Sequence, residues 1–140
     1  MMAIVLGCTV PLLADERNLM EPRVPADKLA EARALTNPLP NEPDVIEKGK
    51  ALYNRKGTCS NCHGSTGRGD GIAAMGLEPS PRNFHDHGFW RHRTDGEIFW
   101  VIKHGSPGTA MIVLDDVLTD EEIWAIIRYE QSLAGDHGPG

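Results

Sequence analysis

The sequence predicts an all-α fold, and three observations support this prediction. No segment of the 140-residue chain alternates apolar and polar residues over the length of a strand. Residues 94–97 (TDGE) and 119–122 (TDEE) both have the capping-box pattern that opens a helix. Apolar residues then recur at helical spacing after positions 44, 94 and 119. We therefore expect one small helical domain, residues 44–134, with a proline-rich N-terminal extension and a flexible tail over 135–140.

The first thirteen residues form an apolar segment without Lys or Arg. They include Val5-Leu6-Gly7-Cys8, which resembles a bacterial lipoprotein box, in which the cysteine becomes the lipidated first residue. The segment is short for a complete signal peptide and lacks a positive n-region. It is also too short, and too interrupted by Pro11, for a transmembrane helix. Two interpretations stay open for 1–13: a signal or lipoprotein remnant with a membrane tether at Cys8, or a frayed apolar end with a free thiol.

Residues 14–43 are polar and rich in proline. A short helix is expected over 26–35, where Leu29 and Ala32 lie at helical spacing. Prolines at 38, 40 and 43 favour an extended chain after it, because each disfavours helix in the residue before it. This segment is interpreted as an extended N-terminal tether, or a strap across the domain, rather than a second core.

The first helix of the domain is expected to begin at Asp44, which suits an N-cap. Val45, Ile46, Leu52 and Tyr53 follow at helical spacing. The Lys56-Gly57 pair predicts the end of this helix.

Residues 59–63 (CSNCH) form a C-x-x-C-H motif, which is the covalent attachment site of a c-type haem. Two intervening residues place both sulfurs on one side of a helical turn, where each thiol can add to one vinyl group. The imidazole of His63 then faces the iron. A zinc site would need a second ligand pair, and the third cysteine is the distant Cys8. A thioredoxin-like pair would need a βαβ context that the sequence lacks.

Composition agrees with one haem c as a core element. Apolar residues make up 40% of the chain, which gives a thin core, and a covalent haem would enlarge it. The net charge of −6 argues against a nucleic-acid partner. Residues 115–140 carry one base and seven acids, whereas 44–114 carry nine bases and seven acids. Such a distribution can steer a partner, and it is also common on solvated surfaces.

The segments after the motif are loops and two further helices. Residues 64–71 hold four glycines, but no Lys-Ser/Thr pair follows them, so a tight loop beside the haem is expected rather than a phosphate-binding loop. Residues 76–93 show no period and are expected to be irregular. A helix is predicted from Thr94 to about His104, and another from Thr119 to about Gly135, with Ile123, Ile126 and Ile127 in its buried stripe.

These pieces together resemble a class I c-type cytochrome of the bacterial monohaem kind, over roughly residues 44–134. The resemblance rests on five segments: Gly49-x-x-x-Tyr53, Cys59-x-x-Cys62-His63-Gly64, Thr94-Asp95-Gly96-Glu97, Gly108-Thr109-Ala110-Met111 and Ile123-Trp124-x-x-x-x-Tyr129. It implies that the first and last helices cross at a small residue and aromatic side chains, which Gly49, Tyr53 and Tyr129 match.

The resemblance also implies a His/Met-ligated iron, with His63 and Met111 as metal ligands. Met111 follows a turn-rich stretch, residues 105–109, although Ile112 stands where many relatives have proline. Met75 is a rival but lies close to the motif in sequence. Four histidines would instead give a bis-histidine site: His85, His87, His92 and His104.

The sequence also offers candidates for groups around the cofactor. The free N–H of His63 needs a carbonyl partner, and the resemblance implies the carbonyl of a proline, with Pro79 and Pro81 as candidates. Arg82 is the candidate cofactor-binding residue for a haem propionate, and Trp90 and Trp100 are alternatives.

The predicted function is one-electron transfer between redox protein partners, without catalysis. A second hypothesis is a cytochrome subunit of a larger membrane-associated oxidoreductase complex in a respiratory chain. A third is a haem sensor or peroxidase with an open iron. Attachment of haem and the anchor-like start predict a periplasmic or other extracytoplasmic location, with a possible lipid anchor.

Overall fold

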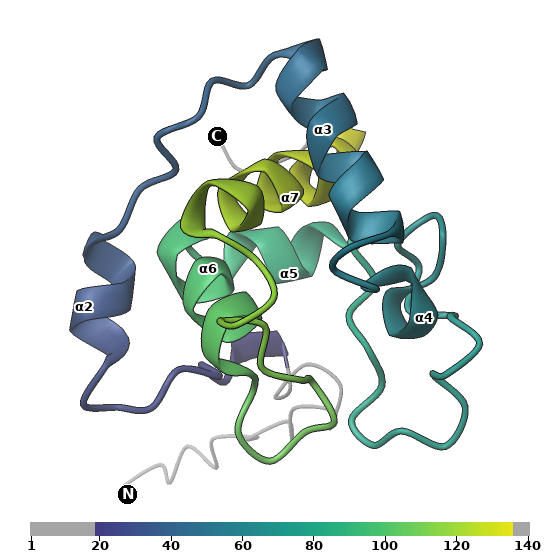
Figure 1. Ribbon diagram of the computed structural model, residues 1–140. Helices are drawn as coiled ribbons and strands as arrows, with labels where there is room; N and C mark the ends of the chain where they lie inside the picture. The colour runs from purple at the N-terminus through teal and green to yellow at the C-terminus, as the bar shows by residue number, and fades with distance from the viewer. Residues whose placement is uncertain (1–18, 136–140) are drawn as a thin grey trace, which may run out of the picture.

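The computed structural model describes residues 19–135, and all regular elements among them are helices (Figure 1). The elements are α2 (Leu29–Ala34), α3 (Pro43–Asn54), α4 (Ser60–His63), α5 (His87–Arg91), α6 (Asp95–His104) and α7 (Asp120–Ser132). The all-α prediction is thus confirmed. Cys8 with its lipoprotein-like box and residues 136–140 lie outside the described part of the chain.

Helices α3 and α7 cross at a glycine (Figure 1). A Cβ atom on Gly49 would lie 2.0 Å from the carbonyl oxygen of Ala125, so no side chain fits there. Next to this crossing the rings of Tyr53 and Tyr129 meet edge to face, with centroids 5.1 Å apart. The structure therefore has the crossing that the sequence motifs predicted.

Both predicted capping boxes are formed. The hydroxyl of Thr94 accepts from the Glu97 N–H (3.2 Å), and the Glu97 carboxylate accepts from the Thr94 N–H (3.0 Å). Thr119 and Glu122 repeat this exchange at the start of α7, at 3.2 and 2.9 Å. Each box satisfies two backbone donors that a helix start would otherwise leave open.

The observed helices differ in part from the sequence-based expectation, and α2, expected over 26–35, spans only Leu29–Ala34. Helix α3 begins at Pro43 with Glu42 as N-cap, not with Asp44, because proline needs no N–H partner in the first helical turn. The expected irregular stretch 76–93 contains α5, whose N-cap Asp86 accepts from the Gly88 N–H at 2.7 Å. Five residues are too few to show a helical period, which is why this helix was missed.

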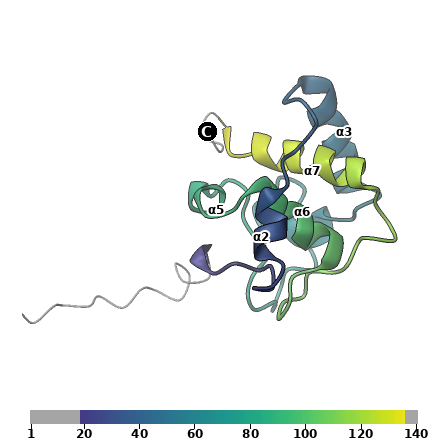
Figure 2. The same ribbon diagram turned by 90° about the vertical axis from the view of Figure 1, so that its left-hand side faces the viewer.

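The described part of the N-terminal extension packs along the domain. Helix α2 lies so close to α6 that a Cβ atom on Gly96 would be 1.8 Å from the Ala32 carbonyl oxygen. Further along, the Asn37 side chain donates to the Trp124 carbonyl (3.0 Å), and Arg128 donates twice to the Leu39 carbonyl (2.9 and 2.7 Å). Figures 1 and 2 show this segment running over α6 toward the start of α3. Residues 19–42, which pack against the domain and include α2, are called the strap below.

Within residues 19–135, no helix combines the length and the apolar composition needed to span a bilayer.

Candidate haem site

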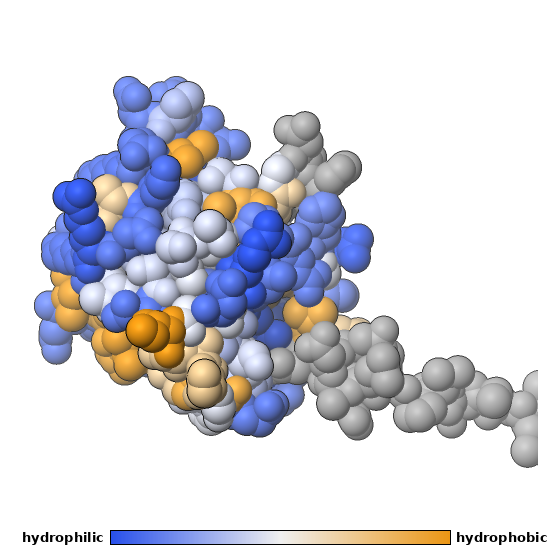
Figure 3. Space-filling model, turned by 90° about the vertical axis from the view of Figure 1, so that its right-hand side faces the viewer, coloured by the Kyte–Doolittle hydropathy of each residue, from blue (hydrophilic) through white to orange (hydrophobic). Residues whose placement is uncertain are grey.

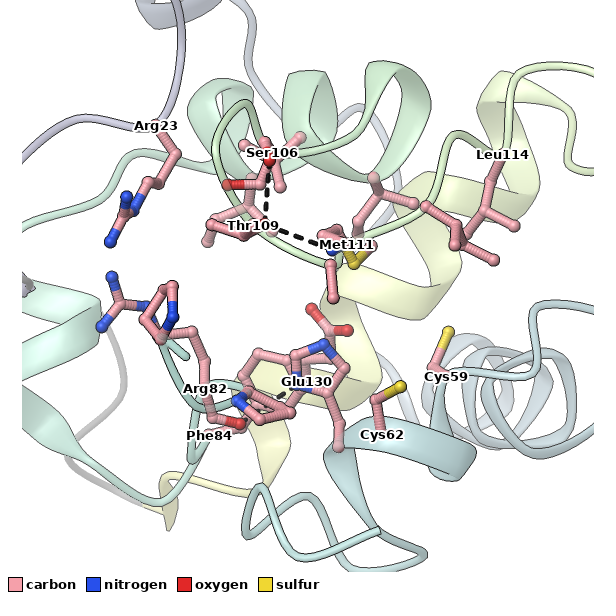
Figure 4. A pocket seen from close by; sticks show the side chains of 18 of the residues that line it. Arg23, Cys59, Cys62, Arg82, Phe84, Ser106, Thr109, Met111, Leu114 and Glu130 are labelled. Atoms are coloured by element: carbon pink, nitrogen blue, oxygen red, sulfur yellow. Dashed lines mark hydrogen bonds between the residues drawn. The ribbon is translucent and has the colours of Figure 1, made fainter. Parts of the chain in front are cut away.

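A cavity of about 320 Å³ lies beside α4 and α6 and is lined by the five leading candidates for binding the cofactor (Figure 4). Its walls include Cys59, Cys62, His63, Arg82 and Met111. These residues come from three separate segments: the C-x-x-C-H turn, the loop after it and the loop between α6 and α7. The fold thus brings them together in one site.

The two thiols lie side by side on one wall (Figure 4). Cys59 is the N-cap residue of α4 and Cys62 is inside it, so one helical turn aims both sulfurs into the cavity. The turn is fastened to α3 by the Tyr53 hydroxyl, which donates to the Gly64 carbonyl at 2.7 Å. Burial is the main cause that raises the pKa of the Cys59 thiol, to about 12. A buried thiol of this kind is neutral near pH 7.

His63 is held in the state that binds a metal. Its Nδ1 lies 3.1 Å from the Arg82 carbonyl oxygen, and its ring stacks on Phe84 with centroids 4.8 Å apart. Burial lowers the pKa of His63, and the bond to Arg82 opposes this only in part. A neutral ring that donates from Nδ1 keeps the Nε2 lone pair available. The carbonyl that orients the ring belongs to Arg82, not to Pro79 or Pro81 as expected; it is one residue beyond Pro81.

Met111 lies across the cavity from Cys62 (Figure 4). A turn positions it: Thr109 donates its hydroxyl to the Ser106 carbonyl (2.8 Å) and accepts from the Met111 N–H (3.2 Å). Ile112 lines the cavity as well, with 57% of its surface exposed. The thioether of Met111 therefore reaches the cavity without a proline at position 112.

The rival ligands lie elsewhere. The four other described histidines, His85, His87, His92 and His104, do not line the cavity, and His85 Nε2 is 2.7 Å from the Thr66 carbonyl oxygen. Met75 is 93% exposed. Trp90 donates its N–H to the Phe84 carbonyl at 2.8 Å, and neither Trp90 nor Trp100 lines the cavity. Within residues 19–135, no three His, Cys, Asp or Glu side chains gather to hold a metal ion, so the zinc interpretation gains no support.

Four charged residues of the cavity wall were missed by the sequence analysis: Arg23, Arg93, Glu97 and Glu130. Nothing local in the sequence marks the two arginines, since they reach the cavity only through tertiary packing. Glu130 did carry a signal, because it follows Ile123 and Ile126 by seven and four residues and so belongs to the buried stripe of α7.

Glu130 is an unusual component of this wall. Its side chain is 3% exposed, its carboxyl group points into the cavity, and its Oε2 has no hydrogen-bond partner (Figure 4). Burial raises the pKa of Glu130 to about 8. A carboxyl group in this environment stays protonated near neutral pH, because burial of an ionised carboxylate without a partner costs free energy.

The described surface also exposes apolar side chains on the two loops that contribute to the cavity. Ile72 and Met75 are each 93% exposed, Val113 61% and Ile112 57%. Figure 3, which views the molecule from the side of these loops, shows apolar atoms gathered on the lower part of that face.

Comparison with known proteins identifies the family of the chain. The family model described as "Cytochrome C oxidase, cbb3-type, subunit III" matches residues 44–129. A solved structure of the reducing HAO-like protein complex of Kuenenia stuttgartiensis is 30% identical, with a TM-score of 0.60, over 69% of this chain and 46% of that one. Cytochrome cL of the marine methylotroph Methylophaga aminisulfidivorans has a similar fold at 23% identity and a TM-score of 0.52, over 75% of this chain and 63% of that one. No curated protein matches.

The chain thus spans less than two thirds of both solved relatives. The family match covers more than half of the chain and includes the C-x-x-C-H turn, Met111 and the α3–α7 crossing. The chain therefore belongs to the cytochrome c family of this model and is a class I c-type cytochrome, a family whose members carry covalent haem c and transfer electrons.

Proposed function

We propose that this chain is a one-electron carrier with a single haem c, attached through Cys59 and Cys62 and ligated by His63 and Met111, with Arg82 at a propionate. The observation that carries this proposal is the convergence of two thiols, a neutral imidazole and a thioether on one cavity. Each of these groups is of a type that haem c uses: thiols for the two thioether bonds, and an imidazole and a thioether for the iron.

The protein's own groups account for carrier behaviour rather than catalysis. When bound, the haem supplies reversible exchange of one electron at iron. His63 and Met111 would hold the iron, and an iron that takes both side chains as ligands would offer no open position to a substrate. A neutral thioether favours Fe(II), so Met111 holds the reduction potential above that of a bis-histidine site.

The cavity walls shield the cofactor from water. Ile98, Ile102 and Leu114 line the cavity, and each exposes 6% or less of its surface. Their burial supplies a low-dielectric lining that disfavours extra charge at the iron. The exposed apolar side chains of the 64–86 and 105–118 loops lie on the cavity side of the fold and fit a redox protein as partner.

A second candidate is a subunit of a larger, membrane-associated oxidoreductase complex in a respiratory chain. Two observations favour it: the family model is described as an oxidase subunit, and one similar structure is part of a protein complex. Purification from the native host separates the two candidates. Isolation only together with other polypeptides supports the subunit. Isolation as a single polypeptide that exchanges electrons with a soluble partner supports the free carrier.

We further propose an extracytoplasmic location, as the haem-attachment motif and the anchor-like start of the sequence imply, and a lipid anchor at Cys8. Fractionation of the native host tests the anchor. The protein should be found with membranes, and Cys8→Ala should release it. An unmodified Met1 in the mass spectrum of native protein would exclude lipidation.

Covalent attachment is the direct test of the haem site. Denatured protein extracted with acidified organic solvent should keep its haem on the polypeptide. Cys59→Ala and Cys62→Ala should each leave one thioether bond, and the double variant should lose its haem to the solvent. Ser60→Ala, between the two cysteines, is the matched control and should keep both bonds. Haem that leaves the wild-type chain would refute the site.

A further inference from the structure

Glu130 is a titratable group of the haem cavity to which the proposed function gives no role. It lies on α7, whereas the thiols and the proposed iron ligands come from α4 and from the loop before α7. Its carboxyl group points into the cavity, and its Oε2 has no hydrogen-bond partner among residues 19–135 (Figure 4). Glu97, a second buried carboxyl group of the wall, accepts from the Thr94 N–H at 3.0 Å and pairs with Arg33 at 3.4 Å. Glu97 is thus compensated, whereas a charge on Glu130 is not.

The groups packed around Glu130 offer it no positive charge. Burial, and after it the charge of Glu130, raises the pKa of Tyr53 on α3, of Cys59 before α4 and of Tyr129 on α7. All three are neutral near pH 7. The remaining charged or titratable residues of the cavity wall are Arg23, Cys62, His63, Arg82, Arg93 and Glu97. Burial is the cause that raises the pKa of Glu130, to about 8.

The charge of the cavity changes when a bound haem changes its redox state. Reduction of the iron removes one unit of positive charge from a site with an apolar, low-dielectric lining. A carboxylate in the same cavity then loses part of the attraction that favours its ionised form, so its affinity for a proton rises. Because such a coupling is reciprocal, protonation of the carboxylate must also raise the affinity of the haem for an electron.

We propose that Glu130 couples electron transfer to proton transfer, because its unpartnered carboxyl group shares the cavity of the redox centre. When the haem accepts one electron from a reduced donor protein, the Glu130 carboxylate accepts one proton from solvent and an O–H bond forms. When the electron leaves, that bond breaks and the proton returns to solvent. The inference rests on the proposed function and adds a proton to the electron that the chain carries.

Redox titration of the holoprotein between about pH 5 and about pH 10 tests the coupling. At the acid end Glu130 is protonated in both redox states, so the potential should not depend on pH. Through the window around its pKa, the affinity for the electron should fall by up to tenfold for each unit that the pH rises, which is about 59 mV for a one-electron couple. Glu130→Gln releases no proton and should hold the acid-end potential across this window.

Glu47→Gln is the matched control. It makes the same substitution at an exposed position of α3, and the charge of Glu47 also reaches Tyr129, after burial and Glu130, as a cause that raises the pKa of that residue. This variant should keep the pH dependence of the wild type. Equal pH dependence in the wild type and in Glu130→Gln would refute the coupling, and so would an equal loss of it in both variants.

Infrared difference spectra of the wild type, reduced minus oxidised, provide a second readout that needs no variant to fold. At a pH within the window, reduction should produce the carbonyl stretch of a protonated carboxyl group, and this band should shift in deuterated water. A band that only moves, without a gain, would show that Glu130 is protonated in both states and overturn the coupling.

The two proposals fail in different ways. A covalent haem that accepts one electron reversibly, with a potential that Glu130→Gln leaves equally dependent on pH, would refute the coupling and leave the carrier intact. A chain whose haem does not accept and return one electron would refute the carrier itself, and the coupling with it.

Discussion

At the scale of single residues, the residues that line the cavity differ in how far apart they lie in the sequence. Cys59, Cys62 and His63 are one motif, so their shared site was predictable. Met111 was expected from the family resemblance, and the structure places it on the same cavity. Arg23 was not predictable, because thirty-six residues and two helices separate it from Cys59.

Glu130 gives the first prediction at this scale. Its pKa of about 8 in the folded protein is above its ordinary value of 4.5, so between these limits the folded state binds more protons than the unfolded state. The free energy of unfolding must then fall as pH rises through this window, by at most about 5 kcal/mol at about 1.4 kcal/mol per pKa unit.

Glu130→Gln should remove this dependence. The melting temperature of the wild-type holoprotein should fall relative to that of the variant as the pH is raised from 5 to ~9. Glu121→Gln breaks only an exposed ion pair with Lys48 and is the control, with a small effect at every pH. Parallel melting curves for wild type and Glu130→Gln across this range would show that Glu130 does not titrate as described.

At the scale of elements, the sequence predicted helix starts well where side chains cap the backbone. The two capping boxes are local patterns, and both are present. The five-residue α5 was not predictable, because Phe89 and Trp90 are held by packing against Phe84 rather than by a periodic pattern. The packing of α2 against α6 also depends on a close backbone approach at Gly96, which propensity alone does not reveal.

The α3–α7 crossing gives a prediction for an element. Gly49→Ala would place a Cβ atom 2.0 Å from the Ala125 carbonyl oxygen, so the two helices must separate. We expect a loss of unfolding free energy of about 1–3 kcal/mol, as is typical when extra atoms enter a packed core. Denaturant titration of the holoprotein measures it. Lys50→Ala, exposed on the same helix, should change stability by less than about 0.5 kcal/mol. Equal losses in both variants would show that the crossing is not tight.

At the scale of the whole molecule, the domain is a helical shell around a cavity. The hydrophobic core of α6 and α7 forms one side of it, and the two long loops form the other. Arg23 from the strap and Arg82 from the 64–86 loop lie on one side of this cavity, and the C-x-x-C-H turn places its thiols on the other side (Figure 4).

The central claim is that the iron is closed by His63 and Met111. The optical spectrum of the oxidised holoprotein tests it most directly, since an iron–thioether bond gives a weak far-red absorption band. We expect this band in the wild type and its loss in Met111→Ala, together with a lower potential and binding of carbon monoxide to the reduced variant. Met75→Ala, at an exposed methionine, should keep the band. A wild-type spectrum without it would contradict the account: rapid binding of carbon monoxide would then indicate an open iron, and exclusion of carbon monoxide a histidine ligand.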